Sequence, residues 1–146
     1  MQMGREIINN TYFGSFSSLD KKAYPKIRVV EAFPPDEKWN IYIGTNSRSR
    51  KVKEILNNPK TAMHYFDKSQ LAYLSLYGNT SIVKDTILRK KYWKNSWKKF
   101  YPDKEKDYLL LKFVPQKLEL INISKAYVGD SLTWKPHQVQ LWTKDF

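Results

Sequence analysis

The alternation of hydrophobic and polar residues in the first third of the chain predicts β-strands. Three segments have this pattern or a short apolar run bounded by turn residues: residues 12–19, 26–33 and 39–45. The connection between the first two ends at Pro25, a residue suited to a turn or a strand edge. We therefore expect these two strands to form a hairpin, and Pro34-Pro35-Asp36 to separate them from the third.

The spacing of the apolar residues then changes from that of a strand to that of a helix. Val52, Ile55 and Leu56 lie at positions i, i+3 and i+4, which predicts a helix of about two turns. Ser47 or Ser49 can cap its start, and the residues at 57–59, Asn-Asn-Pro, can end it. The polar residues of this segment thus lie at the helix start and on its outer face.

Strand patterns return in the middle and late chain, at residues 61–67, 71–83, 108–114 and 117–123. The last two read as one long strand interrupted at Pro115. In 71–83, Leu71, Tyr73, Ser75 and Tyr77 are expected on one face and the intervening residues on the other. Gly78 marks a bulge or a close approach of the backbone.

A second helix is predicted between Asp85, a suitable N-cap, and Pro102. Its apolar face is a stripe of mostly aromatic residues, which belongs more often to a core or an interface than to a ligand site. The members of this stripe are Leu88, Tyr92, Trp93, Trp97 and Tyr101.

The order β-β-β-α-β-β-α-β predicts a mainly antiparallel sheet, closed into a small β-barrel with flanking helices. A doubly wound fold would need helices between the first three strands, and these have none. We expect a single domain over residues 1–146, with residues 124–146 as a C-terminal tail that contains Trp134 and Trp142.

Composition excludes several classes of protein. The 146 residues include no cysteine and two histidines far apart, so neither a disulfide nor a metal centre is expected. His64 lies in a predicted strand and is more simply a packed residue than a catalytic one. No apolar run resembles a signal peptide or a membrane span, and we therefore predict a cytoplasmic protein with no membrane partner.

The net charge is +12, and ten of the 26 basic residues lie in two segments, 44–56 and 89–99. In the first, Arg48, Arg50 and Lys51 stand where a helix begins, although cations there cost about 0.3–1 kcal/mol each. Free backbone N–H groups together with these cations can bind an anion, most often a phosphate. The alternative is a set of solvated surface charges, and spacing alone favours neither.

Nucleic acid is the second candidate anion, because the lysines near Trp93 and Trp97 could neutralise phosphates beside aromatic rings. No RNP or helix-turn-helix signature supports it, so this reading is not favoured.

An ordered set of motifs resembles the FMN-binding split barrel of the pyridoxamine phosphate oxidase superfamily, in its general stress protein branch. The early motifs are Pro25-Lys-Ile-Arg28-Val-Val, Trp39-Asn-Ile-Tyr-Ile-Gly-Thr45, Ser47-Arg-Ser49-Arg50-Lys51-Val-Lys-Glu-Ile and Asn58-Pro-Lys60. The later ones are Leu74-Ser-Leu-Tyr-Gly78, Leu88-Arg-Lys-Lys-Tyr-Trp93 and Asp107-Tyr-Leu-Leu-Leu-Lys-Phe113. The resemblance implies a six-stranded antiparallel split barrel.

The resemblance also implies a cofactor, FMN, and the residues that bind it. Ser49, Arg50 and Lys51 would hold the phosphate, and Thr45 would contact phosphate or ribityl groups. The other implied contacts are Arg28, Val29 and Val30 on the strand along the flavin, and Tyr73 by its position on a later strand. Members are typically homodimers with flavin at the subunit interface.

Two departures from the family pattern bear on activity and geometry. The hairpin that often reads Asp-Gly-x-Pro is Lys22-Ala23-Tyr24-Pro25 here, so an alanine replaces a turn glycine. The C-terminal arginine and histidine pattern that grips the vitamin substrate is absent, so pyridoxamine phosphate oxidation itself is not expected. The sequence thus predicts a flavin-dependent oxidoreductase on an unidentified small molecule. The alternatives are a polyanion-binding barrel and a non-catalytic flavin-binding stress protein.

Overall fold

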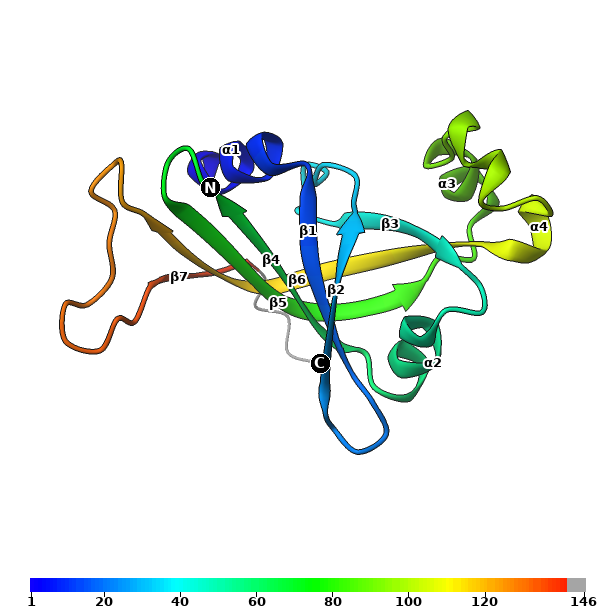
Figure 1. Cartoon of the computed structure of the whole chain (residues 1–146), viewed down its shortest axis with the longest axis horizontal. Helices are drawn as coiled ribbons and strands as arrows, with labels where there is room; N and C mark the ends of the chain where they lie inside the picture. Colours follow the sequence, from blue (N-terminus) through cyan, green and yellow to red (C-terminus); the bar gives the residue numbers. More distant parts are fainter. Residues whose placement is uncertain (142–146) are drawn as a thin grey trace.

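A computed structural model describes residues 1–141 as one antiparallel sheet flanked by short helices (Figure 1). The strands are β1 (Phe13–Leu19), β2 (Pro25–Glu31), β3 (Ile41–Asn46), β4 (Lys60–Asp67), β5 (Ala72–Ile82), β6 (Tyr108–Asn122) and β7 (His137–Gln140). The helices are α1 (Gln2–Thr11), α2 (Arg50–Asn57), α3 (Thr86–Lys91), the 3-10 helix η1 (Asn95–Lys99) and α4 (Lys104–Asp107).

Six strands follow the path β2-β1-β4-β5-β6-β3, and β7 pairs with β6 beside that path. The antiparallel, mainly β architecture predicted from the sequence is confirmed. The predicted closure into a barrel is wrong, because the chain just after β2 meets β3 only at the isolated bridge between Ala32 and Ile43. The Phe33 N–H donates a 2.9 Å bond to the Tyr42 carbonyl beside this bridge, and Pro34 and Pro35, which have no N–H, end the pairing on that side.

The predicted hairpin of β1 and β2 is confirmed, in register from Phe13 opposite Glu31 to Leu19 opposite Pro25. Asp20 holds its turn, since the carboxylate accepts backbone N–H bonds of 2.9 Å from Lys22 and from Tyr24. Ala23 adopts a left-handed φ of 61°, a region that favours glycine. The turn therefore keeps a glycine-type conformation at the expense of some strain.

The bulge predicted at Gly78 is also confirmed, because the pairing of β5 with β6 shifts register between Tyr77 and Gly78. A Cβ at Gly78 would lie 2.1 Å from the carbonyl oxygen of Val114, so a side chain there would collide with backbone. Pro115 stands opposite this bulge, where the ladder tolerates a missing N–H. For that reason β6 continues through Pro115, and the interruption predicted there is wrong.

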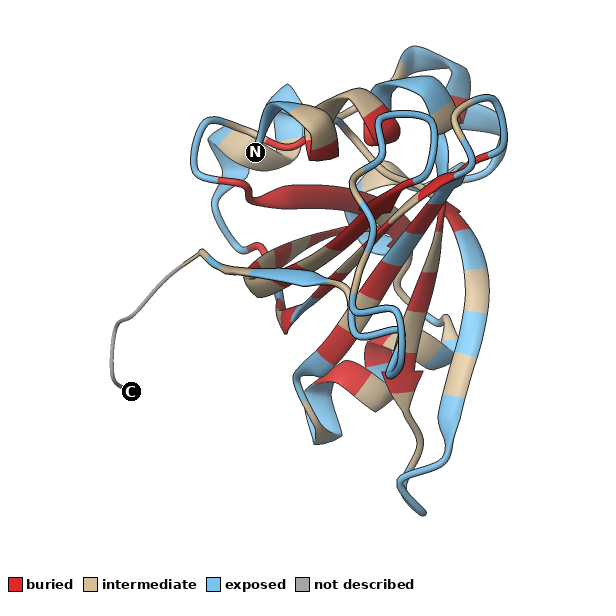
Figure 2. Cartoon of the chain, turned by 90° about the vertical axis from the view of Figure 1, so that its left-hand side faces the viewer, coloured by how far each residue is buried: buried red, intermediate tan, exposed pale blue. Residues whose placement is uncertain are grey.

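The inner side chains of the strands form the main core, and buried positions alternate with less buried ones along β1, β4 and β5 (Figure 2). The predicted alternation on β5 is confirmed, with Leu74 and Leu76 buried and Tyr73 and Tyr77 on the other face. Helix α1, which the pattern did not predict, covers one end of the curved sheet, while α2 lies at the opposite end (Figure 1).

The long helix predicted before Pro102 is wrong. The chain forms α3 and then η1, with an extended backbone at Lys94 (φ −109°, ψ 129°), where the Lys94 ammonium ion-pairs with Glu31 of β2. Burial of the aromatic stripe is nevertheless confirmed, since its members pack in a second core with Tyr42 and Tyr108. We call residues 83–107, which lie at one end of the sheet and pack this second core against β3 and β6, the lobe (Figure 1).

Part of the predicted tail is ordered into the sheet, because β7 pairs with β6 from Lys117 to Leu120. Residues 124–136 connect the two strands and leave Trp134 79% exposed. Trp142 lies outside the described residues. In the part of the chain that the structure describes, no helix is long and apolar enough to span a membrane.

Candidate functional site

The start of α2 brings two of the predicted site residues together. Thr45 is buried at the end of β3, and Ser49 is the N-cap of α2 with an extended backbone (φ −68°, ψ 148°). The Ser49 hydroxyl makes no capping bond and lies 3.3 Å from the Thr45 hydroxyl instead. No acid occupies the first turn of α2, so no carboxylate there neutralises the positive end of the helix.

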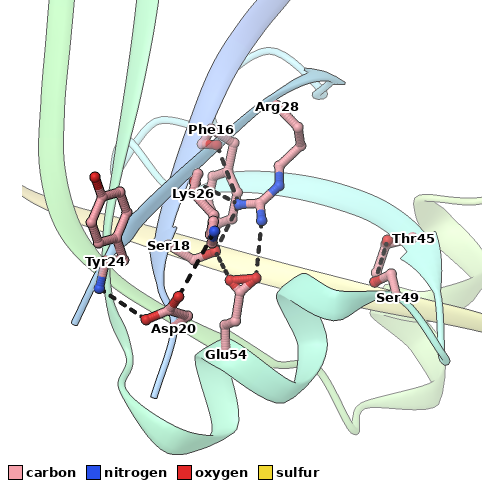
Figure 3. A network of polar contacts seen from close by, with 9 residues as sticks. All are labelled: Phe16, Ser18, Asp20, Tyr24, Lys26, Arg28, Thr45, Ser49 and Glu54. Atoms are coloured by element: carbon pink, nitrogen blue, oxygen red, sulfur yellow. Dashed lines mark hydrogen bonds and ion pairs between the residues drawn. The ribbon is translucent and has the colours of Figure 1, made fainter. Parts of the chain in front are cut away.

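Arg28 reaches the same end of the sheet from β2 and is held by several acceptors (Figure 3). Its guanidinium donates to the Ser18 hydroxyl at 2.7 Å and to the Lys26 carbonyl at 3.1 Å. It also forms a 3.1 Å ion pair with Glu54 of α2, and both side chains are mostly buried, at 19% and 10% exposure. Arg28 is thus oriented before any ligand binds.

Glu54 is the site residue that sequence reasoning missed. Its second oxygen accepts a 3.1 Å bond from the Ser18 hydroxyl, so one carboxylate connects β1, β2 and α2. A signal was present, because Glu54 is the single acid between Gly44 and Lys60, a segment that carries five cations. A lone acid among so many cations indicates a specific partner more strongly than a solvated charge.

Lys51, in the first turn of α2, is half-buried. Burial is the main reason that its pKa is lowered, and the positive charge of Arg28 lowers the pKa further, whereas Glu54 opposes both effects. Lys51 and Arg28 are therefore close enough to repel one another. Two cations that share one carboxylate leave net positive charge at the start of α2, which an anion would stabilise.

Arg50 is exposed and lines a neighbouring hollow of about 320 Å³ between α2 and the β1–β2 turn. The other residues of its wall are Asp20, Lys21, Lys26, Lys53, Glu54 and Asn57. Cations predominate there as well, although Lys26 approaches Asp20 to 3.9 Å (Figure 3). The Arg50 side chain is thus beside the Arg28–Glu54 pair and not bonded within it.

The remaining predicted residues are not grouped with these side chains. Val30 is 7% exposed in the core, and Val29 is 69% exposed on the opposite, outward face. Val29 and Val30 could therefore both contact one ligand only with their backbone atoms, on the edge strand β2. Tyr73 also lies on the outward face, with its ring 5.4 Å from that of His64, and does not join the start of α2 within one chain.

The outward face of the sheet carries exposed apolar side chains as well. Register places Ile27 and Val29 of β2 on the same side as His64 and Phe66 of β4 and Tyr73 of β5. Ile27 is 71% exposed and Phe66 is 55% exposed. His64 donates to or accepts from the Ser75 hydroxyl at 2.9 Å, and burial lowers its pKa, which favours the neutral ring. This half-apolar face suits contact with another surface.

Comparison with known proteins gives a family. A family model described as "Pyridoxamine 5'-phosphate oxidase like" matches residues 20–129, about three quarters of the chain. No curated protein matches the chain closely enough to count as a relative.

Solved structures share the fold. General Stress Protein 26 from Bacillus anthracis str. Sterne has a TM-score of 0.74 at 24% identity, and the match covers 95% of this chain and 96% of that one. A protein from Clostridium acetobutylicum related to general stress protein 26 of B. subtilis gives 0.76 at 19% identity, covering 95% and 92%. A pyridoxamine 5'-phosphate oxidase-related, FMN binding protein from Nostoc punctiforme PCC 73102 gives 0.69 at 9% identity, covering 92% and 93%.

Proposed function

The chain belongs to the pyridoxamine 5'-phosphate oxidase-like family, and on that premise we propose that it binds FMN with the cofactor phosphate at the start of α2. The observation that carries the proposal is the net positive charge of Lys51 and Arg28, which share the single carboxylate of Glu54, at a helix start that also carries the Ser49 hydroxyl, 3.3 Å from that of Thr45. The description of the structural neighbour from Nostoc punctiforme as FMN binding supports the choice of flavin.

The chemistry of the donors fits a phosphate dianion. Two hydroxyls and backbone N–H groups can donate to its oxygens, Lys51 can act as a point charge, and Arg28, whose terminal nitrogens bond Ser18, Lys26 and Glu54, adds positive charge nearby. The Glu54 carboxylate would repel an anion, yet its ion pair fixes the orientation of the Arg28 guanidinium. A phosphate would reverse the present effect on Lys51, because an anion nearby raises the pKa of an ammonium group.

When bound, FMN would supply hydride or electron transfer, while this chain binds, orients and shields the ring. We propose an oxidoreductase that acts on an unidentified small molecule, with a flavin-binding protein without turnover as the alternative. Steady-state reduction of the bound flavin by NAD(P)H, followed by reoxidation with turnover of a second substrate, separates the two. The cytoplasm stays the predicted compartment, on the sequence grounds given above.

We further propose a homodimer in which two outward faces meet. The exposed Ile27, Val29 and Phe66 support this pairing, since they would be removed from water. Tyr73 would then reach a flavin bound at the start of α2 of the other subunit, which accounts for its separation from Arg28 in one chain. Sedimentation equilibrium of Ile27→Asp protein tests the pairing, and an unchanged dimer mass would refute it.

Titration with FMN and with riboflavin, followed by quenching of flavin fluorescence, tests the phosphate site. Lys51→Ala should weaken FMN binding by about tenfold or more, because a charge-assisted contact contributes roughly 1.5–3 kcal/mol. It should leave riboflavin, which lacks the phosphate, unaffected.

Lys53→Ala is the matched control, since Lys53 is an exposed cation on the same helix. It should change FMN affinity by less than about twofold. No measurable FMN binding by the wild type, a haem spectrum in place of a flavin spectrum, or equal losses in the two variants would refute the proposal.

A further inference from the structure

A second basic hollow lies in the lobe, between α3 and α4, away from α2 (Figure 1). Its volume is about 260 Å³, and we call it the lobe pocket. The residues that line it are Thr86, Arg89, Lys90, Lys104, Glu105 and Tyr108. Three cations and one acid thus line the same space, and two of the cations, Arg89 and Lys90, belong to the second basic segment of the sequence, which the FMN proposal does not use.

Arg89 is fixed in this pocket. One terminal nitrogen donates to the carbonyl oxygen of Tyr108 at 3.2 Å, and the guanidinium carbon lies 5.7 Å from the centre of the Tyr108 ring. The Nε atom is buried and has no hydrogen-bond partner among the described residues. A guanidinium held in this orientation in the pocket wall can pair with an anion at little cost in ordering.

Tyr108 supports that arrangement from the start of β6. It is fully buried, and its single hydroxyl hydrogen is shared between the carbonyl oxygens of Tyr92 at 2.9 Å and Arg89 at 3.3 Å. Burial raises the pKa of Tyr108 to about 12, so the hydroxyl stays protonated and keeps donating. The backbone that carries Arg89 is therefore anchored to the same residue as its side chain.

The two lysines of the lobe pocket have no carboxylate partner either. In the described residues, no ion pair includes Arg89, Lys90 or Lys104, although Lys94 pairs with Glu31 elsewhere in the lobe. The Lys104 ammonium lies 4.7 Å above the Trp93 ring, which limits its freedom without neutralising its charge. With Glu105 as the one acid in the wall, the pocket keeps a net charge of +2.

We propose that the lobe pocket binds a compact phosphate-bearing anion, with Arg89 as the bidentate donor and Lys90 and Lys104 as point charges. Its volume is below the range of most small-molecule sites, which suits a phosphate or pyrophosphate group better than a whole nucleotide. A nucleic-acid backbone offers the same chemistry, but it follows an open groove lined with stacking aromatics more readily than a hollow between two short helices.

Calorimetric titration with pyrophosphate tests this proposal. The titration uses Lys51→Ala protein, so that the start of α2 contributes little to the heat. In that background, Lys90→Gln/Lys104→Gln should lower pyrophosphate affinity by tenfold or more. Lys98→Gln/Lys99→Gln is the matched control, because it removes the same charge from exposed positions of η1 and should change affinity by less than twofold.

Arg89→Lys keeps the charge and removes the fork, and we expect it to weaken binding by at least fivefold with an unchanged circular dichroism spectrum. Equal losses in the two lysine double variants would overturn the proposal in favour of diffuse attraction. No binding of pyrophosphate in any form of the protein would overturn it as well. Tight, salt-sensitive binding of single-stranded RNA that both double variants weaken alike would make the lobe a polyanion surface instead.

Discussion

Gly44 precedes Thr45 on β3 and lies directly under the Trp97 ring of the lobe, so Gly44→Ala tests how the lobe is joined to the sheet. A Cβ at this position would lie 2.5 Å from both Cη2 and Cζ3 of Trp97, and 3.3 Å from a ring carbon of Tyr108. Carbon atoms in contact prefer separations of about 3.5–4.0 Å. The indole must therefore withdraw by about 1 Å, or β3 must shift by a similar distance.

Both movements would cost free energy of folding, because Trp97 is closely packed. Trp97 is 8% exposed, and its ring centre lies 5.8 Å from those of Phe33 and Trp93 and 5.9 Å from those of Tyr101 and Tyr108. Overpacking of this kind costs about 1–3 kcal/mol, and with aromatic neighbours on several sides we expect roughly 2 kcal/mol. For a chain of this length, that loss should lower Tm by about 4–8 °C.

Urea unfolding followed by circular dichroism measures the loss as a lower midpoint with an unchanged m-value. A double-mutant cycle identifies its cause. In a Trp97→Leu background, where the facing ring atoms are gone, Gly44→Ala should cost less than about 0.5 kcal/mol. The reasoning fails if Gly44→Ala is neutral in the wild type, or if its cost is the same in both backgrounds.

Three further predictions follow from single contacts. Glu54→Gln should lower the free energy of unfolding at pH 7 by about 1–2 kcal/mol, because Arg28 would keep its charge and lose the carboxylate with which it pairs; no change in urea unfolding would contradict this. The pKa of Glu31 is lowered, mainly by the hydrogen bond from Lys94, so its stabilising effect should be present above the unfolded-state pKa and disappear as pH falls through the folded-state pKa. Glu31→Gln should accordingly reduce the acid-dependent loss of stability between about pH 5 and pH 3, and equal slopes in the two proteins would refute the assignment. Ala23→Gly should raise the unfolding free energy by about 0.5–1 kcal/mol, since relief of the left-handed strain exceeds the entropy that glycine adds to the unfolded chain, and a lower urea midpoint would contradict it.

The strands were predictable from sequence because one of their faces is buried and the other is not, which produces an alternation that survives in the residue pattern. Helix α1 gave no such signal. Its fully buried apolar side chains are the adjacent pair Ile7 and Ile8, and its N-cap is Met1, whose side chain makes no capping bond. Its position depends on contacts with β4 and β5, which are distant in sequence.

The lobe shows the opposite case, in which a real pattern indicated the wrong local structure. Helical spacing of the aromatic residues between Leu88 and Tyr101 correctly predicted their burial. The same spacing could not show that Trp93 and Trp97 pack edge to face at 88°, nor that Lys94 leaves the helical conformation and pairs with Glu31. Tertiary packing overrode local propensity at that residue.

The candidate site was predictable in its cations and not in its acid. Charges at the start of α2 and the family resemblance both indicated Ser49, Arg50 and Lys51. Glu54 was identified as a site residue only from the three-dimensional structure. The ion pair of Glu54 with Arg28 joins residues 26 positions apart in sequence. Neither hydrophobic periodicity nor capping rules predict contacts over that distance.

The incomplete closure of the sheet explains why the candidate FMN site forms where it does. Arg28 lies on β2 and Thr45 on β3, and these are the two strands at which the ladder ends. The two segments touch at the bridge between Ala32 and Ile43. Residues 25–31 of β2 are not paired with β3, so another element must pack between the two strands there. Helix α2 supplies that element, since it follows β3 directly and its Glu54 bonds back to Arg28. If β2 and β3 were paired along their whole length, their backbones would fill the space in which Ser49 and Lys51 of α2 now lie.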